Sequence, residues 1–222
     1  MIIDVLNRQS PMISAAHRNI AALTSCILIW STTWAVIRVG LDAIPPFKGA
    51  AMRFAIAGAL LLAVALIRRV PLGRTSRERW LWLSNGALNF AASYGIVYWA
   101  EQWVPSGLTA IIFSSYPLFL ALVAHVMLPG ERLTPRSGAG VFVGFVGIAV
   151  ICYGDFALLG GDDKARGAVV MLGSPIACAF ASAAVKRWGE DVHPLSLTSV
   201  PMLICAAILG VLALLLESAR PI

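Results

Sequence analysis

The sequence is poor in charged residues and in residues that build metal or redox centres. Only 13% of its 222 residues are charged and 59% are hydrophobic, against about 25% charged in a typical soluble protein. A soluble domain of this size could not cover so much apolar surface. The three histidines and four cysteines are scattered, and no two cysteines form a CxxC pair. We therefore expect no disulfide framework, no metal site and no bound cofactor.

Sequence signatures of catalysis are also missing. The chain has no HExxH, no GxSxG and no Walker loop, so we assign no catalytic residues and do not expect an enzyme. The net charge of +6 would suit a nucleic-acid-binding protein, but the Lys and Arg residues fall mainly between apolar segments rather than along one stripe. We interpret them as charges that orient the chain in a membrane, with no nucleic-acid partner.

What the sequence does have is a series of long apolar runs. A helix that crosses a bilayer needs about 20 apolar residues, and the runs are continuous and rich in Leu, Ala and Val, unlike the short alternating strands of a β-barrel. They predict an all-α integral membrane protein with transmembrane helices at Ile20–Val39, Phe47–Ile67, Trp80–Trp99, Pro105–Leu128, Ser137–Tyr153, Gly167–Val185 and Leu195–Leu216.

The basic residues predict the direction of insertion. Lys and Arg gather in the loops that lie on the cytoplasmic side if the N-terminus is cytoplasmic, above all in the arginine-rich loop 68–79. Cytoplasmic loops carry such an excess. We expect a multi-pass protein of the inner or plasma membrane with its N-terminus in the cytoplasm.

The sixth and seventh apolar runs repeat the pattern of the first two. A shift of 148 residues places Trp34–Leu66 on Ser182–Leu214 without a gap and superimposes Pro46 on Pro194. The matched helices are five crossings apart, so the second copy would have the opposite orientation, as in the inverted repeats of many transporters. We predict a five-helix module at residues 20–153 and a partial second module of two helices at 167–216.

Several motifs resemble those of the EamA-like drug/metabolite transporter superfamily. The more specific ones are Ala100-Glu-Gln with Pro105-Ser-Gly-Leu, and Gly130-Glu-Arg-Leu; weaker ones are Leu28–Trp34, Met52–Gly58 and Tyr116-Pro-Leu. The resemblance implies an exporter of ten helices in two inverted modules around a central cavity, coupled to protons or to exchange. Against that pattern the sequence looks truncated after seven helices.

Two functions follow as alternatives. The first is a secondary transporter that exports small metabolites or drugs by alternating access. The second is a membrane remnant that does not transport, or that needs a partner chain in a homo- or hetero-oligomer. A small-molecule substrate and the lipid bilayer are the expected partners, and the sequence names no substrate.

Polar and aromatic residues inside the runs are the candidates for a substrate cavity. They are Trp30, Thr33, Arg53, Asn85, Asn89, Ser93, Ser114, Ser115, Tyr116 and Pro117. Each also has a plainer interpretation: the stripe Asn85, Asn89 and Ser93 would suit hydrogen bonds between helices, Arg53 could reach the headgroups, and Pro117 could simply bend its helix.

One acidic residue is a candidate for proton coupling. Glu101 follows the third run at the expected outer boundary. It is either a solvated carboxylate or a proton-binding group at the mouth of a cavity. Gly140 and Gly144 in the fifth run have the spacing that lets two helices approach closely, either inside the module or between protomers.

Overall fold

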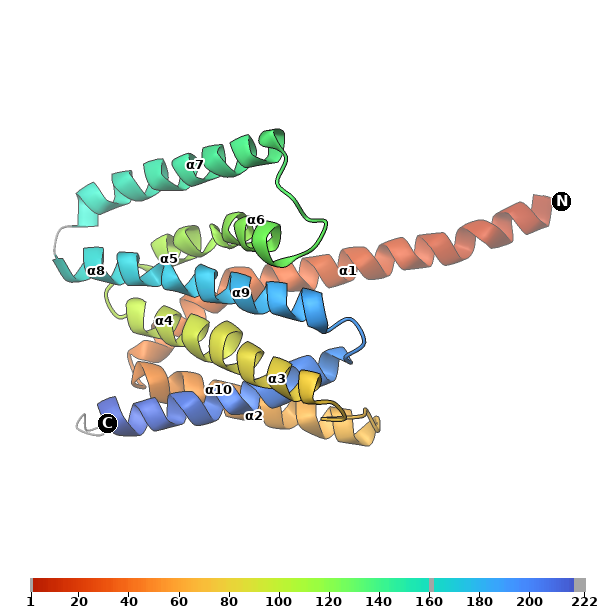
Figure 1. Ribbon diagram of the computed structural model, residues 1–222, viewed down its shortest axis with the longest axis horizontal. Helices are drawn as coiled ribbons and strands as arrows, with labels where there is room; N and C mark the ends of the chain where they lie inside the picture. The colour runs from red at the N-terminus through yellow and green to blue at the C-terminus, as the bar shows by residue number, and fades with distance from the viewer. Residues whose placement is uncertain (1, 160–161, 218–222) are drawn as a thin grey trace.

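The chain is a bundle of helices, and the described part contains no strand (Figure 1). The computed structural model describes the backbone of residues 2–159 and 162–217. In chain order the helices are α1 Ile2–Leu41, α2 Pro46–Ile67, α3 Ser76–Ser84, the π-helix η1 Asn85–Ala92, α4 Ser93–Ala100, α5 Ser106–Phe113, α6 Tyr116–Met127, α7 Pro135–Leu159, α8 Asp162–Met171, α9 Gly173–Trp188 and α10 Pro194–Leu216.

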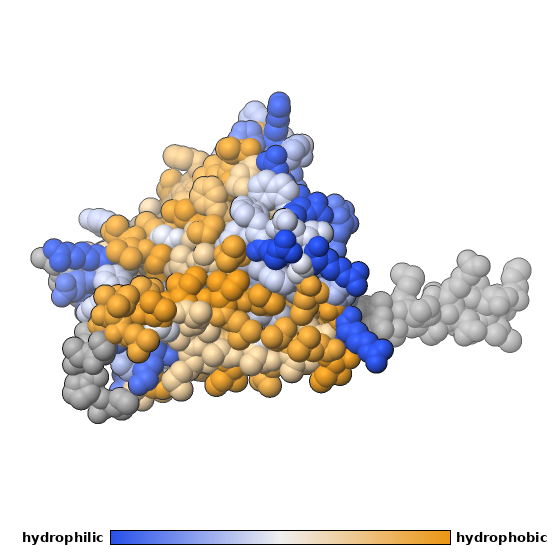
Figure 2. All heavy atoms as spheres, turned by 60° about the horizontal axis from the view of Figure 1, so that its bottom comes forward, coloured by the Kyte–Doolittle hydropathy of each residue, from blue (hydrophilic) through white to orange (hydrophobic). Residues whose placement is uncertain are grey.

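Within these described residues, six helical stretches are long and apolar enough to cross a membrane. They are Asn19–Leu41, Pro46–Ile67, Ser106–Met127, Pro135–Tyr153, Asp163–Trp188 and Pro194–Leu216. Each contains or nearly coincides with an apolar run predicted from the sequence, which confirms the all-α membrane fold. Figure 2 shows hydrophobic side chains across the middle of one face and hydrophilic ones at its margins, as expected for a protein in a bilayer.

The remaining predicted crossing is a segmented helix. α3, η1 and α4 follow one another from Ser76 to Ala100, and the π-helical segment lies in their middle. A π-helical segment widens the helix, and such segments are frequent at functional sites. Here it covers Asn85 and Asn89, two residues of the predicted polar stripe.

The crossing that contains Pro117 is also divided. α5 ends at Phe113 and α6 begins at Tyr116. The amide of Ser115 bonds to the carbonyl of Ile112, three residues back, at 3.1 Å. Proline at the start of α6 cannot donate to the preceding turn. The predicted bend therefore lies just before Pro117, at Ser114 and Ser115.

The two helices matched by the 148-residue shift, α2 and α10, pack against each other and run antiparallel (Figure 1). A Cβ added to Gly58 of α2 would lie 3.1 Å from the backbone nitrogen of Leu203 in α10, so the helices touch closely there. Farther along, the end of α10 meets the start of α2 through Glu217 and Phe47. The internal repeat stays a prediction, with which an antiparallel arrangement of its two copies agrees.

The glycines of α7 contribute one close contact. A Cβ at Gly144 would lie 2.9 Å from the side chain of Leu118 in α6, whereas nothing lies within 4 Å of a Cβ at Gly140. Gly144 thus packs inside the bundle, and Gly140 faces away from the described residues.

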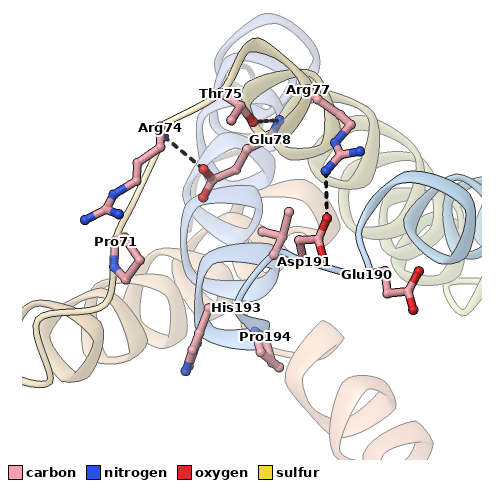
Figure 3. Close-up of a pocket in the computed structure, with 10 residues that line it drawn as sticks. Pro71, Arg74, Thr75, Arg77, Glu78, Glu190, Asp191, His193 and Pro194 are labelled. Carbon is pink, nitrogen blue, oxygen red and sulfur yellow. Dashed lines mark hydrogen bonds and ion pairs between the residues drawn. The ribbon is translucent and has the colours of Figure 1, made fainter.

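The loops 68–75, 128–134 and 189–193 lie together at one end of the bundle (Figure 1), as alternate loops of a membrane protein must. At this end the Arg77 guanidinium pairs with Asp191 at 3.2 Å (Figure 3). Lys186 pairs with Glu131. These ion pairs connect α3 to the loop before α10, and α9 to the loop before α7.

Candidate functional site

Aromatic side chains from three crossings meet inside the bundle. Trp34 of α1 lies 5.4 Å from Phe113 at the end of α5, and Phe113 stacks on Tyr116 at 6.0 Å between ring centroids. Tyr94 of α4 lines a small cavity together with Trp34 and Phe113. We call Trp34, Tyr94, Phe113 and Tyr116 the aromatic cluster. It lies at the break between α5 and α6, where Phe113 contacts both Trp34 of α1 and Tyr116 of α6.

Polar groups surround this cluster. The Tyr116 hydroxyl donates a hydrogen bond of 2.9 Å to the Ser182 hydroxyl of α9. Ser114 and Ser115 bond to carbonyls three residues back, each at 2.6 Å. Their hydroxyls therefore satisfy the backbone at the helix break, which leaves Tyr116 as the residue of this segment that links two crossings.

Two α1 candidates lie beside the cluster. Trp30 and Thr33 line the same small cavity as Trp34. Thr33 donates its hydroxyl to the carbonyl of Ile29 at 2.7 Å, and Trp30 keeps half of its surface exposed. Pro117 is exposed at the start of α6. Among these three, only Trp30 and Thr33 face the space that the aromatic cluster encloses.

The predicted polar stripe forms contacts between helices. Asn85 is buried and donates its amide to the carbonyl of Leu197 in α10 at 2.7 Å. The Ser93 hydroxyl, also buried, pairs with that of Ser174 in α9 at 2.8 Å. Such bonds between helices in a membrane are worth about 0.6 kcal/mol on average. At Asn85 and Ser93 the stripe therefore forms hydrogen bonds between helices rather than the lining of a cavity.

Asn89, the middle residue of the stripe, is less enclosed. Its side-chain oxygen accepts a bond from the Cys178 thiol of α9 at 2.9 Å, and the residue is half-buried. It therefore also joins two crossings, while part of its amide remains on the surface.

Arg53 lies on the exposed surface of α2, close to two tyrosines of α4. Its guanidinium lies 3.5 Å from the Tyr98 hydroxyl and 5.9 Å from the centre of the Tyr94 ring. A cation within about 6 Å of an aromatic face is attracted by the ring. Tyr94 therefore connects Arg53 to the aromatic cluster.

Glu101 is fully buried in the connection between α4 and α5, outside the crossings (0% exposed). Both carboxylate oxygens lack a hydrogen-bond partner among the described residues, which corrects the interpretation of Glu101 as a solvated carboxylate. Burial raises the pKa of Glu101 to about 8, and the nearby Arg38 guanidinium lowers it in part. Arg38 itself donates to the backbone carbonyls of Glu101 and Gln102.

Five residues of this site were not among the candidates predicted from the sequence: Trp34, Tyr94, Tyr98, Phe113 and Ser182. Tyr94 and Tyr98 are one turn apart on the same helix as Ser93, so their spacing was a usable signal. Phe113 and Ser182 carry no such pattern, because aromatic and small residues are common in every crossing. Among the described residues, no group of three or more His, Cys, Asp or Glu side chains is placed to hold a metal ion.

Comparison with known proteins places the chain in a family. Residues 18–153, more than half of the chain, match the EamA-like transporter family. The chain belongs to this family. The match covers the crossings that carry the aromatic cluster and Arg53, together with Glu101.

Individual relatives of this chain are named as transporters. The chain is 28% identical over 188 residues to the uncharacterized transporter YvbV of Bacillus subtilis, covering 84% of this chain and 60% of that protein. It is 34% identical over 164 residues to the uncharacterized inner membrane transporter YedA of Escherichia coli K12, covering 72% of this chain and 51% of YedA. The chain thus spans roughly half to three fifths of the length of these relatives.

A solved crystal structure has the same fold. It superimposes with a TM-score of 0.63 at 28% sequence identity and covers 90% of this chain and 68% of its own. The family and the six long apolar helices of the described residues make the chain a multi-pass membrane protein, and its fold has already been seen in a crystal.

Proposed function

We propose that this EamA-like chain is a secondary transporter that exports a small organic solute by alternating access. The observation that carries the proposal is the meeting of the aromatic cluster with Arg53, assembled from four different crossings. Aromatic faces and a few polar groups inside a membrane bundle suit the binding of a small organic molecule. The cavity between them has a volume of about 10 Å³, so it must open during the transport cycle to admit a solute.

Two further features support alternating access. Secondary transporters place their sites at discontinuous helices, and the break between α5 and α6 lies directly beside the aromatic cluster. At one end of the bundle, the pairs Arg77–Asp191 and Lys186–Glu131 join separate helices on the surface. Exposed ion pairs are weak, so they suit a closure that must open in each cycle.

We also propose that Glu101 binds the coupling proton. It is buried without a partner, and ionisation without a partner is costly in such a place. The charged groups on the elements packed against it are Arg38 of α1 and, on α8, the acids Asp162 and Asp163 and the cations Lys164 and Arg166; Gly167 of α8 contacts Val104. Of these charges, only that of Arg38 affects the pKa of Glu101 appreciably. Glu101 can therefore gain or lose a proton near neutral pH.

The experiment uses everted membrane vesicles from cells that produce the chain. A pH-sensitive dye reports proton movement when amino acids, nucleosides and aromatic carboxylates are added one at a time. We expect at least one solute to release protons above the level of vesicles without the chain. If none does so, and none is taken up as a radiolabelled compound, the chain is not a transporter.

Matched tryptophan variants test the site. Trp34→Leu removes a member of the aromatic cluster, whereas Trp80→Leu changes a half-exposed tryptophan that contacts Trp188 instead. We expect the first to slow solute uptake several-fold and the second to leave it near the wild-type rate. Equal effects of the two would contradict the assignment of the site.

A glutamine variant separates proton coupling from solute movement. In Glu101→Gln we expect solute exchange to continue while uptake driven by a pH gradient is lost. Full gradient-driven uptake in this variant would assign the coupling proton to another group.

A further inference from the structure

Arg53 is an unpaired cation inside a membrane crossing. It lies about 10 Å from the start of α2 at 1.5 Å per residue. A guanidinium is always charged and has five N–H donors. Within the described residues, no carboxylate lies within 4 Å of it, and its contacts are the Tyr98 hydroxyl and the Tyr94 ring. Most of its donors are therefore free.

The surroundings of Arg53 are aromatic on one side. Tyr94 contacts Phe54 edge-to-face at 4.8 Å, which holds the ring in place below the guanidinium. The same Tyr94 lines the cavity with Trp34 and Phe113. The guanidinium of Arg53 thus lies beside the ring of Tyr94, which we call the aromatic wall, and the same ring borders the cavity.

We propose that this place binds the carboxylate of a flat, apolar organic anion, and thus that organic anions are the substrate class of the transporter. Arg53 pairs with the carboxylate through two parallel N–H groups, the geometry in which arginine binds this group most strongly. The aromatic ring of Tyr94 contacts the apolar part of the molecule. The cavity between Tyr94 and Trp34 has a volume of only about 10 Å³, so these rings move apart when the anion binds. The inference rests on the proposed function for its physiological meaning, but binding can be measured without transport.

A cation would be the wrong occupant for this place. Arg53 repels it, and the described residues offer no acid within ion-pair distance of the guanidinium to compensate. A lipid phosphate is the other anion within chemical reach, because arginine side chains in membranes extend toward headgroups. The two sources of anion differ in one respect. Only the organic carboxylate makes use of the aromatic wall.

The test is equilibrium binding to the full chain, purified in a non-ionic detergent and followed by titration calorimetry. The probe is 2-naphthoate, and 2-naphthylmethanol is its neutral counterpart of nearly the same shape. We expect wild-type protein to bind naphthoate at least tenfold more tightly than the alcohol. Arg53→Gln should remove that preference. Arg68→Gln, the same substitution at the exposed end of α2, should keep it.

Two variants of Tyr94 test whether its aromatic ring contributes to naphthoate binding. Tyr94→Phe keeps the ring and should bind naphthoate within about threefold of wild type, whereas Tyr94→Leu should weaken binding at least tenfold. Thermal unfolding of each variant verifies that it is folded. Equal binding of naphthoate and the alcohol by wild type, or unchanged naphthoate binding by folded Arg53→Gln, would overturn the proposal.

Nanodiscs distinguish the two sources of anion, because a choline cation compensates the lipid phosphate in phosphatidylcholine and nothing does so in phosphatidylglycerol. In discs of phosphatidylcholine with or without one fifth phosphatidylglycerol, we expect naphthoate binding to be equal. If the anionic lipid abolishes it, Arg53 binds headgroups and the proposal is wrong. Naphthoate binding without solute uptake would leave the site intact and contradict the proposed transport alone, whereas uptake of neutral solutes without naphthoate binding would contradict only this inference.

Discussion

The carboxylate of Glu217, just after the end of α10, accepts a hydrogen bond of 2.8 Å from the backbone N–H of Phe47 at the start of α2. A second bond of 3.0 Å comes from the N–H of Lys48. The first amides of a helix have no partner within the helix, and Pro46 before them has no N–H to donate. A side chain far along the chain therefore caps α2 and ties its start to the end of α10.

This contact predicts the effect of removing the carboxylate. Glu217→Ala should lower the stability by about 1–2 kcal/mol, the usual cost of losing a helix cap, and Glu217→Gln should lose less because its amide oxygen still accepts one bond. The measurement is the melting temperature in detergent. Glu190→Ala, an exposed acid in the loop before α10, serves as the control and should melt with the wild type. Equal melting of all variants would show that the cap contributes nothing.

A second prediction concerns pH. Burial raises the pKa of Glu101 from its ordinary value of 4.5 to about 8, so the folded chain binds this proton more tightly than the unfolded chain. Its contribution to stability is therefore full below about pH 4.5 and is lost as the pH rises through about 8. We expect the melting temperature of the wild type to fall between pH 5 and pH 9.

Glu101→Gln provides the comparison for the pH experiment, because its amide has no proton to lose in this range. Its melting temperature should change less between the same two pH values. If the wild type and the variant show the same slope, other groups cause the pH dependence and Glu101 ionises as an ordinary carboxylate.

A third prediction tests the packing of α2 on α10. At Gly58 even one added carbon would press on the Leu203 backbone, so Gly58→Leu should destabilise the chain by about 1–3 kcal/mol, as overpacking does. Gly138→Leu is the matched control, because nothing lies within 4 Å of a Cβ there. Thermal unfolding and gel filtration measure both. A Gly58→Leu protein as stable as Gly138→Leu would show that the two helices do not touch as described.

A fourth prediction concerns orientation, for which the arginine-rich loop 68–79 is the main argument. Green fluorescent protein becomes fluorescent only in the cytoplasm, so we expect it to fluoresce when it is fused after Gly73. Alkaline phosphatase becomes active only on the outer side of the membrane, so we expect it to be active when it is fused after Gln102. The reversed pattern would place the N-terminus outside and move Glu101 to the cytoplasmic side.

Much of the fold could be predicted from the sequence because the bilayer imposes a simple rule. A backbone in hydrocarbon must satisfy its own hydrogen bonds, so each long apolar run becomes a helix and its length alone locates the crossing. The bend before Pro117 was equally predictable, since proline lacks the donor that the preceding turn needs. The family followed from local motifs such as Gly130-Glu-Arg-Leu.

The site depends on contacts that no local pattern contains. From the sequence, Glu101 could be a solvated carboxylate or a proton-binding group, and only the fold showed that it is buried beside Arg38 of α1. Asn85 and Ser93 were ambiguous, because helical spacing shows only that polar groups share a face, and their partners in α10 and α9 showed which surface they meet.

The sequence by itself determined that this chain lies in a membrane as a series of helices, because hydrophobic length is a property of each segment alone. Only the tertiary structure decided which polar groups are paired and which are left free. Pairing depends on distances between segments far apart in the chain. Arg53 lies beside two tyrosines and, among the described residues, beside no acid for that reason.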